Sequence, residues 1–431
     1  MLHPWWVGCS GAAEPLVVCT GGSHLVYEEG SQAPSACNTV DDVMTTMCEI
    51  DVELGFTPES HAIDDPQHRG LRRAGPRSGA PYGADGIETH RCRATDDTQT
   101  GVCEHSLTNA GFDVVDLSGF DTLQSTFEAI RAAGRISDAD AAIIRTELNG
   151  AVLPLSGDQS AQVLHIAEEG LIMRCAGPNR LSVVGGSRGM NDHGPATAVH
   201  ADQDVYGTPL LQVMGGRAPE LLVHDSPDGN NHDSNLMLVN LWIPLHQITQ
   251  PLVLADGRSI DRRRHQLRYG LATDSFLDRD DDQVINDIWK FLYDPAQRWT
   301  LHSEMDHRSA YLFNTCSTPH GAGNLAGEDV AEVCYRLLES AEQALEAGDV
   351  GALTELLNTA ALPQLPAHGT PALRSAIEAM LDLLAAAAAP VATAAHQHGD
   401  FDAAEWLRSA RAARRTVVRM SLELRLVVSI R

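Results

Sequence analysis

Two histidines and one aspartate are the residues of this sequence whose types and spacing could hold a metal ion. His200 and Asp202 stand two positions apart, and His320 follows a short apolar segment far downstream. In a β-strand, residues two apart project from the same face, so the side chains of His200 and Asp202 can reach one ion. Two imidazoles and one carboxylate on one face of an iron(II) ion, with the other positions open, are used by oxygen-activating non-haem enzymes. The spacing of His200 and Asp202 fits such a site, and His320 is a candidate for its second histidine.

A longer set of motifs surrounds these residues and carries a resemblance to a known family. In order, the motifs are His200-Ala-Asp202-Gln203, Asn240-Leu-Trp242-Ile-Pro244-Leu245, the segment 251–261, Gln297-Arg298-Trp299, Ser303-Glu-Met305-Asp306, and Leu312-Phe313 with Pro319-His320. From residue 199 to about residue 336 the chain resembles the iron(II)/2-oxoglutarate-dependent oxygenases, most closely the phytanoyl-CoA hydroxylase kind and the related fungal hydroxylase/desaturase group. The resemblance implies the α+β class and a double-stranded β-helix (jelly-roll or cupin-like) barrel with flanking helices.

The resemblance also implies how the cofactors are held. Iron(II) would bind His200, Asp202 and His320, with 2-oxoglutarate as the cosubstrate and dioxygen completing the site. His302 and His307 compete with His320 for the role of second histidine. His320 is preferred because the family places this ligand directly after a strand, with a proline before it.

Three further residues are candidates for binding the cosubstrate. In the family, an arginine on the strand after the second histidine pairs with the far carboxylate of 2-oxoglutarate, a bidentate match that lysine makes less well. Arg336 is the predicted anchor, although its segment also has the spacing of an amphipathic helix. Alternation along a strand at 235–245 places Asn240 and Trp242 on one face. They would contact cosubstrate or substrate if that face is the barrel interior. Alternatively, Trp242 is a core residue and Asn240 bonds to backbone.

The activity that the resemblance implies is oxidation of an unactivated C–H bond in a small metabolite, coupled to decarboxylation of 2-oxoglutarate to succinate. Hydroxylation is the expected outcome, desaturation or ring formation are alternatives, and specialised metabolism is the expected setting. A zinc hydrolase on the same three ligands remains open, and so does a non-catalytic metabolite-binding scaffold. Arg188, Arg217 and Arg258 could contact a substrate carboxylate or lie on the surface.

Composition argues against several classes of partner. The formal charge of -27 argues against nucleic acid and against an anionic membrane surface, because both need clustered cations. The nine cysteines are odd in number and form no C-x-x-C pair, which favours a reducing cytosol. The first residues lack a basic segment and a long apolar run, so no secretory signal is expected. These observations predict a cytoplasmic protein that acts on a small molecule.

Three regions are predicted along the chain. Residues 1–105 are expected to be loop-rich and poorly defined, residues 106–345 to form the barrel domain, and residues 346–431 to form a helical extension. Apolar spacing predicts a strand at 110–117 and helices at 39–54, 122–133, 137–148, 159–170, 284–292, 335–346, 350–361, 371–388, 392–399 and 402–428. The last helix is basic and amphipathic, which predicts docking on the protein itself or on a second subunit in a homodimer.

Overall fold

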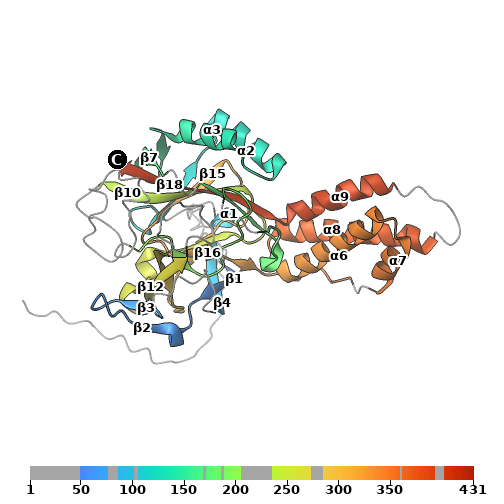
Figure 1. The fold of residues 1–431 in the computed structure, drawn as a ribbon, viewed down its shortest axis with the longest axis horizontal. Coiled ribbons are helices and arrows are strands. Elements are labelled where there is room, and N and C mark those ends of the chain that lie inside the picture. Colours follow the sequence, from blue (N-terminus) through green and yellow to red (C-terminus); the bar gives the residue numbers. More distant parts are fainter. Residues whose placement is uncertain are drawn as a thin grey trace, which may run out of the picture. The chain divides into compact units, whose positions relative to one another are not determined.

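The computed structural model describes residues 49–75, 86–100, 105–167, 171–185, 189–204, 235–272, 285–359, 362–393 and 402–431. The chain divides into two compact units, Met1–Met44 and Thr45–Arg431, and all the described residues belong to the second. Two β-sheets and two groups of helices make up this unit (Figure 1). The predicted α+β class is confirmed.

The larger sheet has strands from both ends of the unit. Its strands are β1 (Glu49–Phe56), β2 (Ala62–Asp64), β3 (Arg72–Ala74), β4 (Glu88–Asp96), β9 (His200–Ala201), β11 (Leu252–Ala255), β12 (Gln266–Ala272), β13 (Ile285–Phe291), β14 (Trp299–Leu301), β16 (His320–Ala322) and β17 (Asn324–Leu325). Their order is β17-β1-β4-β14-β11-β16-β9-β13-β12-β3-β2. All pairs are antiparallel except β12 with β3 and β14 with β4. Strands β9 and β16 therefore lie side by side near the middle of this sheet.

The smaller sheet is antiparallel and is centred on the last strand of the chain. Its strands are β5 (Phe112–Asp116), β6 (Val152–Pro154), β7 (Ser160–Ile166), β8 (Ile172–Ala176), β10 (Leu236–His246), β15 (Ser309–Asn314) and β18 (Arg419–Ile430). They follow the order β5-β15-β10-β18-β7-β6, and β8 also pairs with β18. An apolar cluster joins Trp242 and Phe313 of this sheet to Leu252 and Leu254 of the larger one. The two sheets thus face each other across a shared interior, as a double-stranded β-helix requires.

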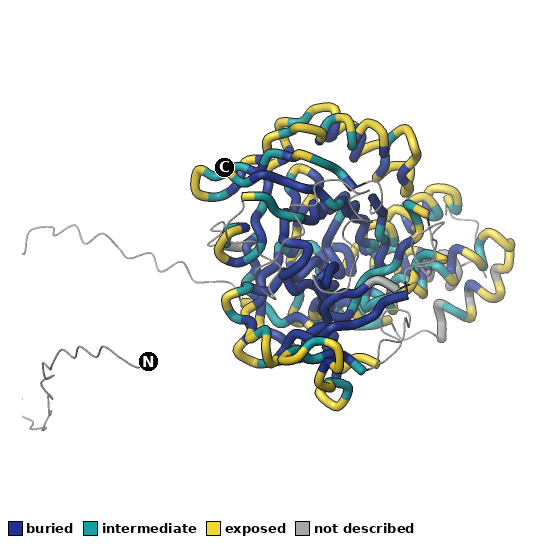
Figure 2. The backbone as a smooth tube through the Cα atoms, turned by 60° about the vertical axis from the view of Figure 1, so that its left-hand side comes forward, coloured by how far each residue is buried: buried dark blue, intermediate teal, exposed yellow. Residues whose placement is uncertain are grey.

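The longer helices form two groups outside the two sheets (Figure 1). They are α1 (Asp97–Thr100), α2 (Asp121–Ala133), α3 (Asp138–Leu148), α5 (Arg262–His265), α6 (Glu328–Glu346), α7 (Val350–Thr359), α8 (Pro371–Thr393) and α9 (Ala403–Thr416). The apolar faces of α2 and α3 pack on the smaller sheet, and α3 begins at the predicted Ser137 with a capping box to Asp140. Helices α6 to α9 pack on one another, and their buried side chains form one apolar cluster with residues of the larger sheet. Figure 2 shows the strands mostly buried and the outer helix surfaces exposed.

The two faces of β18 have opposite character. Leu422, Leu424 and Leu426 belong to the apolar cluster with α2 and α3. The alternate residues from Arg419 to Arg425 are polar. They project from the face opposite to the leucines and therefore point to the barrel interior. This strand alternates with a period of two over most of its length, which is the reason that it pairs with β10 along ten residues of its register.

Several sequence predictions need correction. Residues 160–166 and 285–291 are strands β7 and β13 rather than helices. Short apolar runs of this length fit the periodicity of a helix and that of a strand, and pairing within a sheet decides between them. The predicted helix at 402–428 ends at Thr416 and gives way to β18, so the region 346–431 is not wholly helical. The sheets include β1 and β4 from before the predicted boundary at 105, and the described end of the predicted helix 39–54 is part of β1.

The remaining predicted elements are found. The strand predicted at 110–117 is β5, and the helices predicted at 122–133, 137–148, 335–346, 350–361 and 371–388 correspond to α2, α3, the second part of α6, α7 and α8. Helix α9 buries Trp406 and Ala410 within the chain and forms ion pairs from Arg411 and Arg414 to acidic residues of α6. Its apolar face therefore docks on the protein itself. The predicted helix at 392–399 lies almost wholly outside the described residues.

Candidate metal centre

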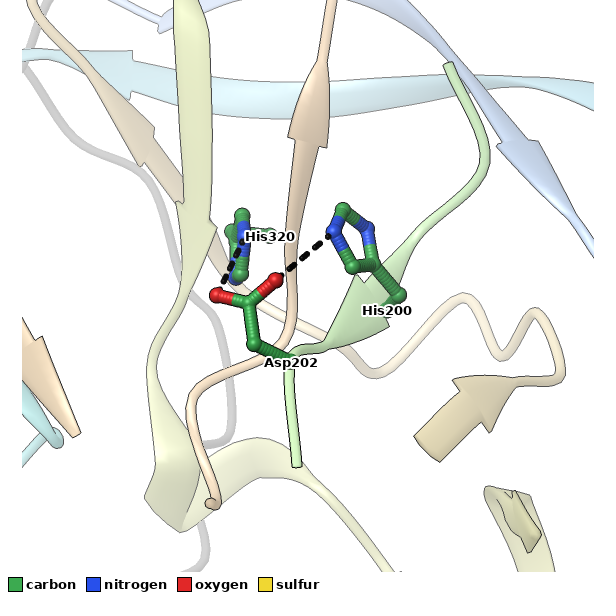
Figure 3. Close-up of side chains that lie close together, drawn as sticks. All are labelled: His200, Asp202 and His320. Atoms are coloured by element: carbon green, nitrogen blue, oxygen red, sulfur yellow. Dashed lines mark ion pairs between the residues drawn. The ribbon is translucent and has the colours of Figure 1, made fainter. Parts of the chain in front are cut away.

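The predicted triad comes together between the sheets, with both histidines on neighbouring strands of the larger sheet. His200 on β9 lies directly opposite His320 on β16 in an antiparallel register, so their side chains share the interior face. Asp202 follows β9 by one residue. One ligand atom from each of the three side chains lies within 4.8 Å of the others, and all three side chains are buried (Figure 3). Within the described residues this is the one group of such side chains that could hold a metal ion.

Both imidazoles are held in the orientation that a metal ligand needs. Nδ1 of His200 lies 2.9 Å from the carbonyl oxygen of Ala198, and Nδ1 of His320 lies 3.0 Å from that of Thr318. A carbonyl oxygen only accepts, so each Nδ1 carries a proton, and the neutral form of such a ring leaves Nε2 bare for a metal. Nε2 of His200 is 3.4 Å from Oδ1 of Asp202, and Nε2 of His320 is 3.8 Å from Oδ2. The backbone two residues before each histidine thus selects its tautomer.

The protonation states of the triad also suit a metal. Burial alone would raise the pKa of Asp202, but the nearby side chains of His200, His320 and Arg425 lower it well below its usual range. Burial and the neighbouring His200 lower the pKa of His320 to about 4, against the opposing effect of Asp202. At neutral pH the site therefore offers an ionised carboxylate and a neutral imidazole, the forms that bind metal.

The two other residues predicted from the β10 motif also face the interior. The Asn240 side-chain amide donates to Oδ2 of Asp202 at 2.6 Å and accepts from the Thr315 hydroxyl at 2.6 Å. Trp242 packs against Tyr311 and lines the small cavity beside the histidines. Asn240 therefore contacts a triad carboxylate, which neither interpretation of the sequence anticipated, whereas Trp242 is both a core residue and a wall of the site.

A small cavity adjoins the triad on the side of the smaller sheet. Its volume is about 20 Å³, and it is lined by Arg174, Ala196, His200, Trp242, Leu252, Phe313, His320, Gly321, Ala322, Arg419 and Glu423. Arg419 is 2% exposed, and its Nε has no hydrogen-bond partner, while its Nη1 donates to the Gln250 carbonyl oxygen at 2.7 Å. The hydroxyl of Ser421, two residues along the same strand face, is also buried without a partner. Buried donors without a protein partner are uncommon in folded proteins, and these two could donate to a polar ligand or to a water molecule.

The charge on this wall is predominantly positive. Burial and the nearby Arg174 lower the pKa of Arg419 to about 10, which leaves it charged at neutral pH. Arg425 reaches toward the metal ligands, with 3.9 Å between its Nη2 and Oδ1 of Asp202. The single lysine of the sequence, Lys290 on β13, lies opposite His200 in the register and over the Tyr269 ring. The interior around the triad is therefore suited to an anionic ligand.

The predicted anchor Arg336 is not at the site, which is a correction. Residues 328–346 form helix α6, and the Arg336 side chain is 58% exposed, with its guanidinium 2.8 Å from Glu332 one turn away. The amphipathic alternative considered for this segment is the correct one. Arg258 likewise pairs with Asp256 at 2.8 Å and is about half exposed, while Arg188 and Arg217 lie outside the described residues.

The sequence contained a signal for the residues that were missed. Arg419, Ser421, Glu423 and Arg425 alternate with leucines and a methionine, which is the period-two pattern of a half-polar strand. The preceding arginine-rich helix α9 obscured this pattern, because basic and apolar residues mix in both segments. The next strand in the chain after β16 and β17 is β18, which is reached once the helices α6 to α9 are passed.

Comparisons with known proteins give the following matches. A family model described as an oxidoreductase/YMDC permease-like domain matches residues 173–327, which is less than half of the chain. No curated protein matches the sequence. Solved structures of an iron and alpha-ketoglutarate-dependent endoperoxidase, NvfI, are similar. One, at 14% identity and a TM-score of 0.43, covers 89% of this chain and 98% of that chain. The same enzyme in a different conformation, at 16% identity and a TM-score of 0.40, covers 64% and 90%.

The barrel topology and the geometry of the triad are observations on this chain itself. Two facing, largely antiparallel sheets, with a His/Asp/His group on one wall, form the fold that the resemblance implied.

Proposed function

We propose that this protein is a non-haem iron(II)- and 2-oxoglutarate-dependent oxygenase that oxidises an unactivated C–H bond of a small metabolite. The observation that carries the proposal is the buried triad of His200, Asp202 and His320, whose Nε2 atoms and carboxylate converge. Two imidazoles and one carboxylate on one face leave the remaining metal positions open for a cosubstrate and for oxygen. The triad would hold the iron(II), because both histidines point Nε2 toward Asp202 and the pKa values of Asp202 and His320 favour an ionised carboxylate and a neutral imidazole.

The opposite wall supports a dicarboxylate cosubstrate. Arg419 lines the triad cavity and has an Nε without a partner. The Ser421 hydroxyl, also without a partner, lies two residues along β18, and a guanidinium with a neighbouring hydroxyl suits a carboxylate. They would hold the carboxylate of 2-oxoglutarate that lies far from the metal. A cavity of about 20 Å³ has room for about one water molecule, so side chains of the lining must move when the cosubstrate binds.

The remaining interior residues would exclude water from the reaction. Trp242, Tyr311 and Phe313 form a buried aromatic wall. Leu252 and Leu254 of the larger sheet pack against this wall, and Leu254 lies opposite His320 in the strand register. When bound, iron(II) and 2-oxoglutarate supply the oxygen-dependent chemistry, in which decarboxylation to succinate accompanies oxidation of the substrate. A dry apolar lining limits the side reactions of such chemistry.

Anaerobic calorimetric titration tests this proposal. We expect 2-oxoglutarate to bind the iron(II)-loaded protein and not the metal-free protein, and succinate to form when air is admitted. The variant His320→Ala should bind neither metal nor cosubstrate. Metal binding without any 2-oxoglutarate binding would contradict the proposal and favour the zinc-hydrolase alternative on the same three ligands.

The wider expectations from the sequence are part of the proposal. No helix in the described part of the chain has the length and apolar character needed to cross a membrane. We infer a cytoplasmic enzyme of specialised metabolism that acts on a small molecule, with no nucleic-acid partner. A homodimer through the C-terminal helices would have to use faces other than the apolar face of α9, because that face is already packed within the chain.

A further inference from the structure

Glu423 is a second carboxylate beside the triad, and the metal ligands do not account for it. It lies on the interior face of β18, opposite Trp242 in the register with β10. The residue is 8% exposed and lines the cavity next to the histidines. A buried carboxylate is unfavourable unless its oxygens are hydrogen-bonded or paired with charge. Its partners therefore indicate what it does.

Asn240 connects Glu423 to the triad. Its side-chain Nδ2 donates to Oε1 of Glu423 at 2.9 Å and to Oδ2 of Asp202 at 2.6 Å. Its Oδ1 accepts from the Thr315 hydroxyl at 2.6 Å. The orientation of this amide is forced, because a rotated amide would place its oxygen against two carboxylates that can only accept. Both amide hydrogens are thus used, one on each carboxylate.

Arg174 fixes the other end of this chain of contacts. Its Nε donates to Oε2 of Glu423 at 3.2 Å, and its Nη1 donates to the Gly194 carbonyl oxygen at 3.0 Å. Arg174 comes from β8, the direct neighbour of this end of β18, so the ion pair lies within the sheet. The complete sequence of partners is Arg174, Glu423, Asn240 and Asp202. Each donor meets an acceptor and no oxygen faces another oxygen.

We propose that Glu423 is a positioning residue that acts through Asn240 to fix the carboxylate of Asp202 for metal binding. The inference rests on the proposed function, since it assigns Asp202 as a metal ligand. Asp202 lies one residue beyond β9 and lacks the strand pairing that holds the two histidines. A contact from the opposite sheet replaces that support. Glu423 holds the amide of Asn240, Asn240 holds one oxygen of Asp202, and Arg174 balances the charge of Glu423.

This arrangement makes the effect of Glu423 on the metal measurable. Changes at residues that orient metal ligands typically reduce metal affinity by about 10–100-fold. In Glu423→Gln the side chain keeps its volume, but one former oxygen becomes an NH₂ group that faces a donor. Either Asn240 or Arg174 then loses its acceptor. The double variant Arg174→Gln with Glu423→Gln restores the pairing. The new amide at 423 can accept from Asn240 through its oxygen and donate through its NH₂ group to the amide oxygen at 174.

The test is a titration with cobalt(II), read by its visible absorption bands and by calorimetry, on purified full-length variants. We expect Glu423→Gln to bind cobalt about 10-fold more weakly, and Glu423→Ala up to about 100-fold more weakly, with altered bands in both. The double variant should recover part of the affinity lost in Glu423→Gln. The control Glu405→Gln removes an exposed partner of Arg408 and should behave as wild type.

Unfolding of the metal-free proteins separates positioning from general stability. The inference predicts that Glu423→Gln loses more metal affinity than its metal-free unfolding midpoint alone would explain, and that the double variant recovers it. A Glu423→Gln protein with wild-type cobalt affinity and bands would overturn the inference and leave the proposed function standing. A wild-type protein that binds no cobalt would overturn both.

Discussion

The two walls of the barrel interior hold their functional side chains in different ways. On the metal wall, formed by β9 and β16, each histidine is oriented by a carbonyl oxygen two residues back in its own segment. On the opposite wall, formed by β10 and β18, the polar side chains are supported by partners from distant segments, as Glu423 is by Arg174. Local backbone thus fixes the two histidine donors, whereas the full topology is needed to fix Asp202 and the residues that face the histidines.

The largest effect should follow a change on the metal wall. Asp202→Ala removes a metal ligand and leaves Arg425 without its nearest carboxylate in the interior. We expect a loss of metal affinity greater than the roughly 100-fold limit typical of residues that only orient a ligand, together with loss of succinate formation. Calorimetric metal titration measures this effect, with the exposed Asp64→Ala as the control. If Asp202→Ala bound metal as tightly as the wild-type protein, Asp202 would not be a metal ligand.

On the opposite wall, Arg419→Met should affect the cosubstrate and not the metal. Removing one partner of a buried charge pair costs about 2–5 kcal/mol of binding free energy. We expect 2-oxoglutarate to bind the iron-loaded variant more weakly by this amount, while its metal affinity stays within twofold of wild type. Arg336→Met is the matched control and should change neither, because that side chain is exposed on α6. If Arg336→Met weakened 2-oxoglutarate binding and Arg419→Met did not, Arg336 would be the anchor.

The outer face of β18 separates structural from functional contributions within one strand. Leu424 is 1% exposed in the cluster with α2 and α3. Leu424→Ala should lower the free energy of unfolding by about 2–5 kcal/mol, through lost burial and the cavity that remains. Denaturant unfolding measures that change. Metal and cosubstrate affinities of the folded variant should stay at wild-type values, and a loss of either would show that the two faces are not independent.

The smallest effect is expected at Ser421. Its hydroxyl is buried without a partner, so a bound carboxylate would supply the missing hydrogen bond. A hydrogen bond to a charged group contributes about 1.5–3 kcal/mol at most in such settings, and a neutral one about 1 kcal/mol. Ser421→Ala should therefore weaken 2-oxoglutarate binding by less than Arg419→Met does. If Ser421→Ala bound 2-oxoglutarate as tightly as the wild-type protein or more tightly, the carboxylate of 2-oxoglutarate would not contact Ser421.

The contrast between the walls also explains what the sequence could predict. His200 and Asp202 were identified because their spacing in a strand is a local property, and His320 because its surrounding motif is local too. Arg419 was missed because α6 to α9 stand between β17 and β18, and the basic residues of α9 extended the helical pattern across 419. Strands β7 and β13 were predicted as helices because a short apolar run is compatible with either structure. Pairing with distant strands decides between the two, and a single sequence does not show that pairing.

The central claim is that a metal on one wall and a carboxylate anchor on the other bind 2-oxoglutarate together. Anaerobic addition of 2-oxoglutarate to the iron(II)-loaded protein tests it most directly, by the visible metal-to-ligand charge-transfer band. We predict a band in the wild-type protein and in Arg336→Met, no band in Asp202→Ala, and a band in Arg419→Met only at much higher cosubstrate concentration. No band in wild-type protein that demonstrably holds iron(II) would contradict the account.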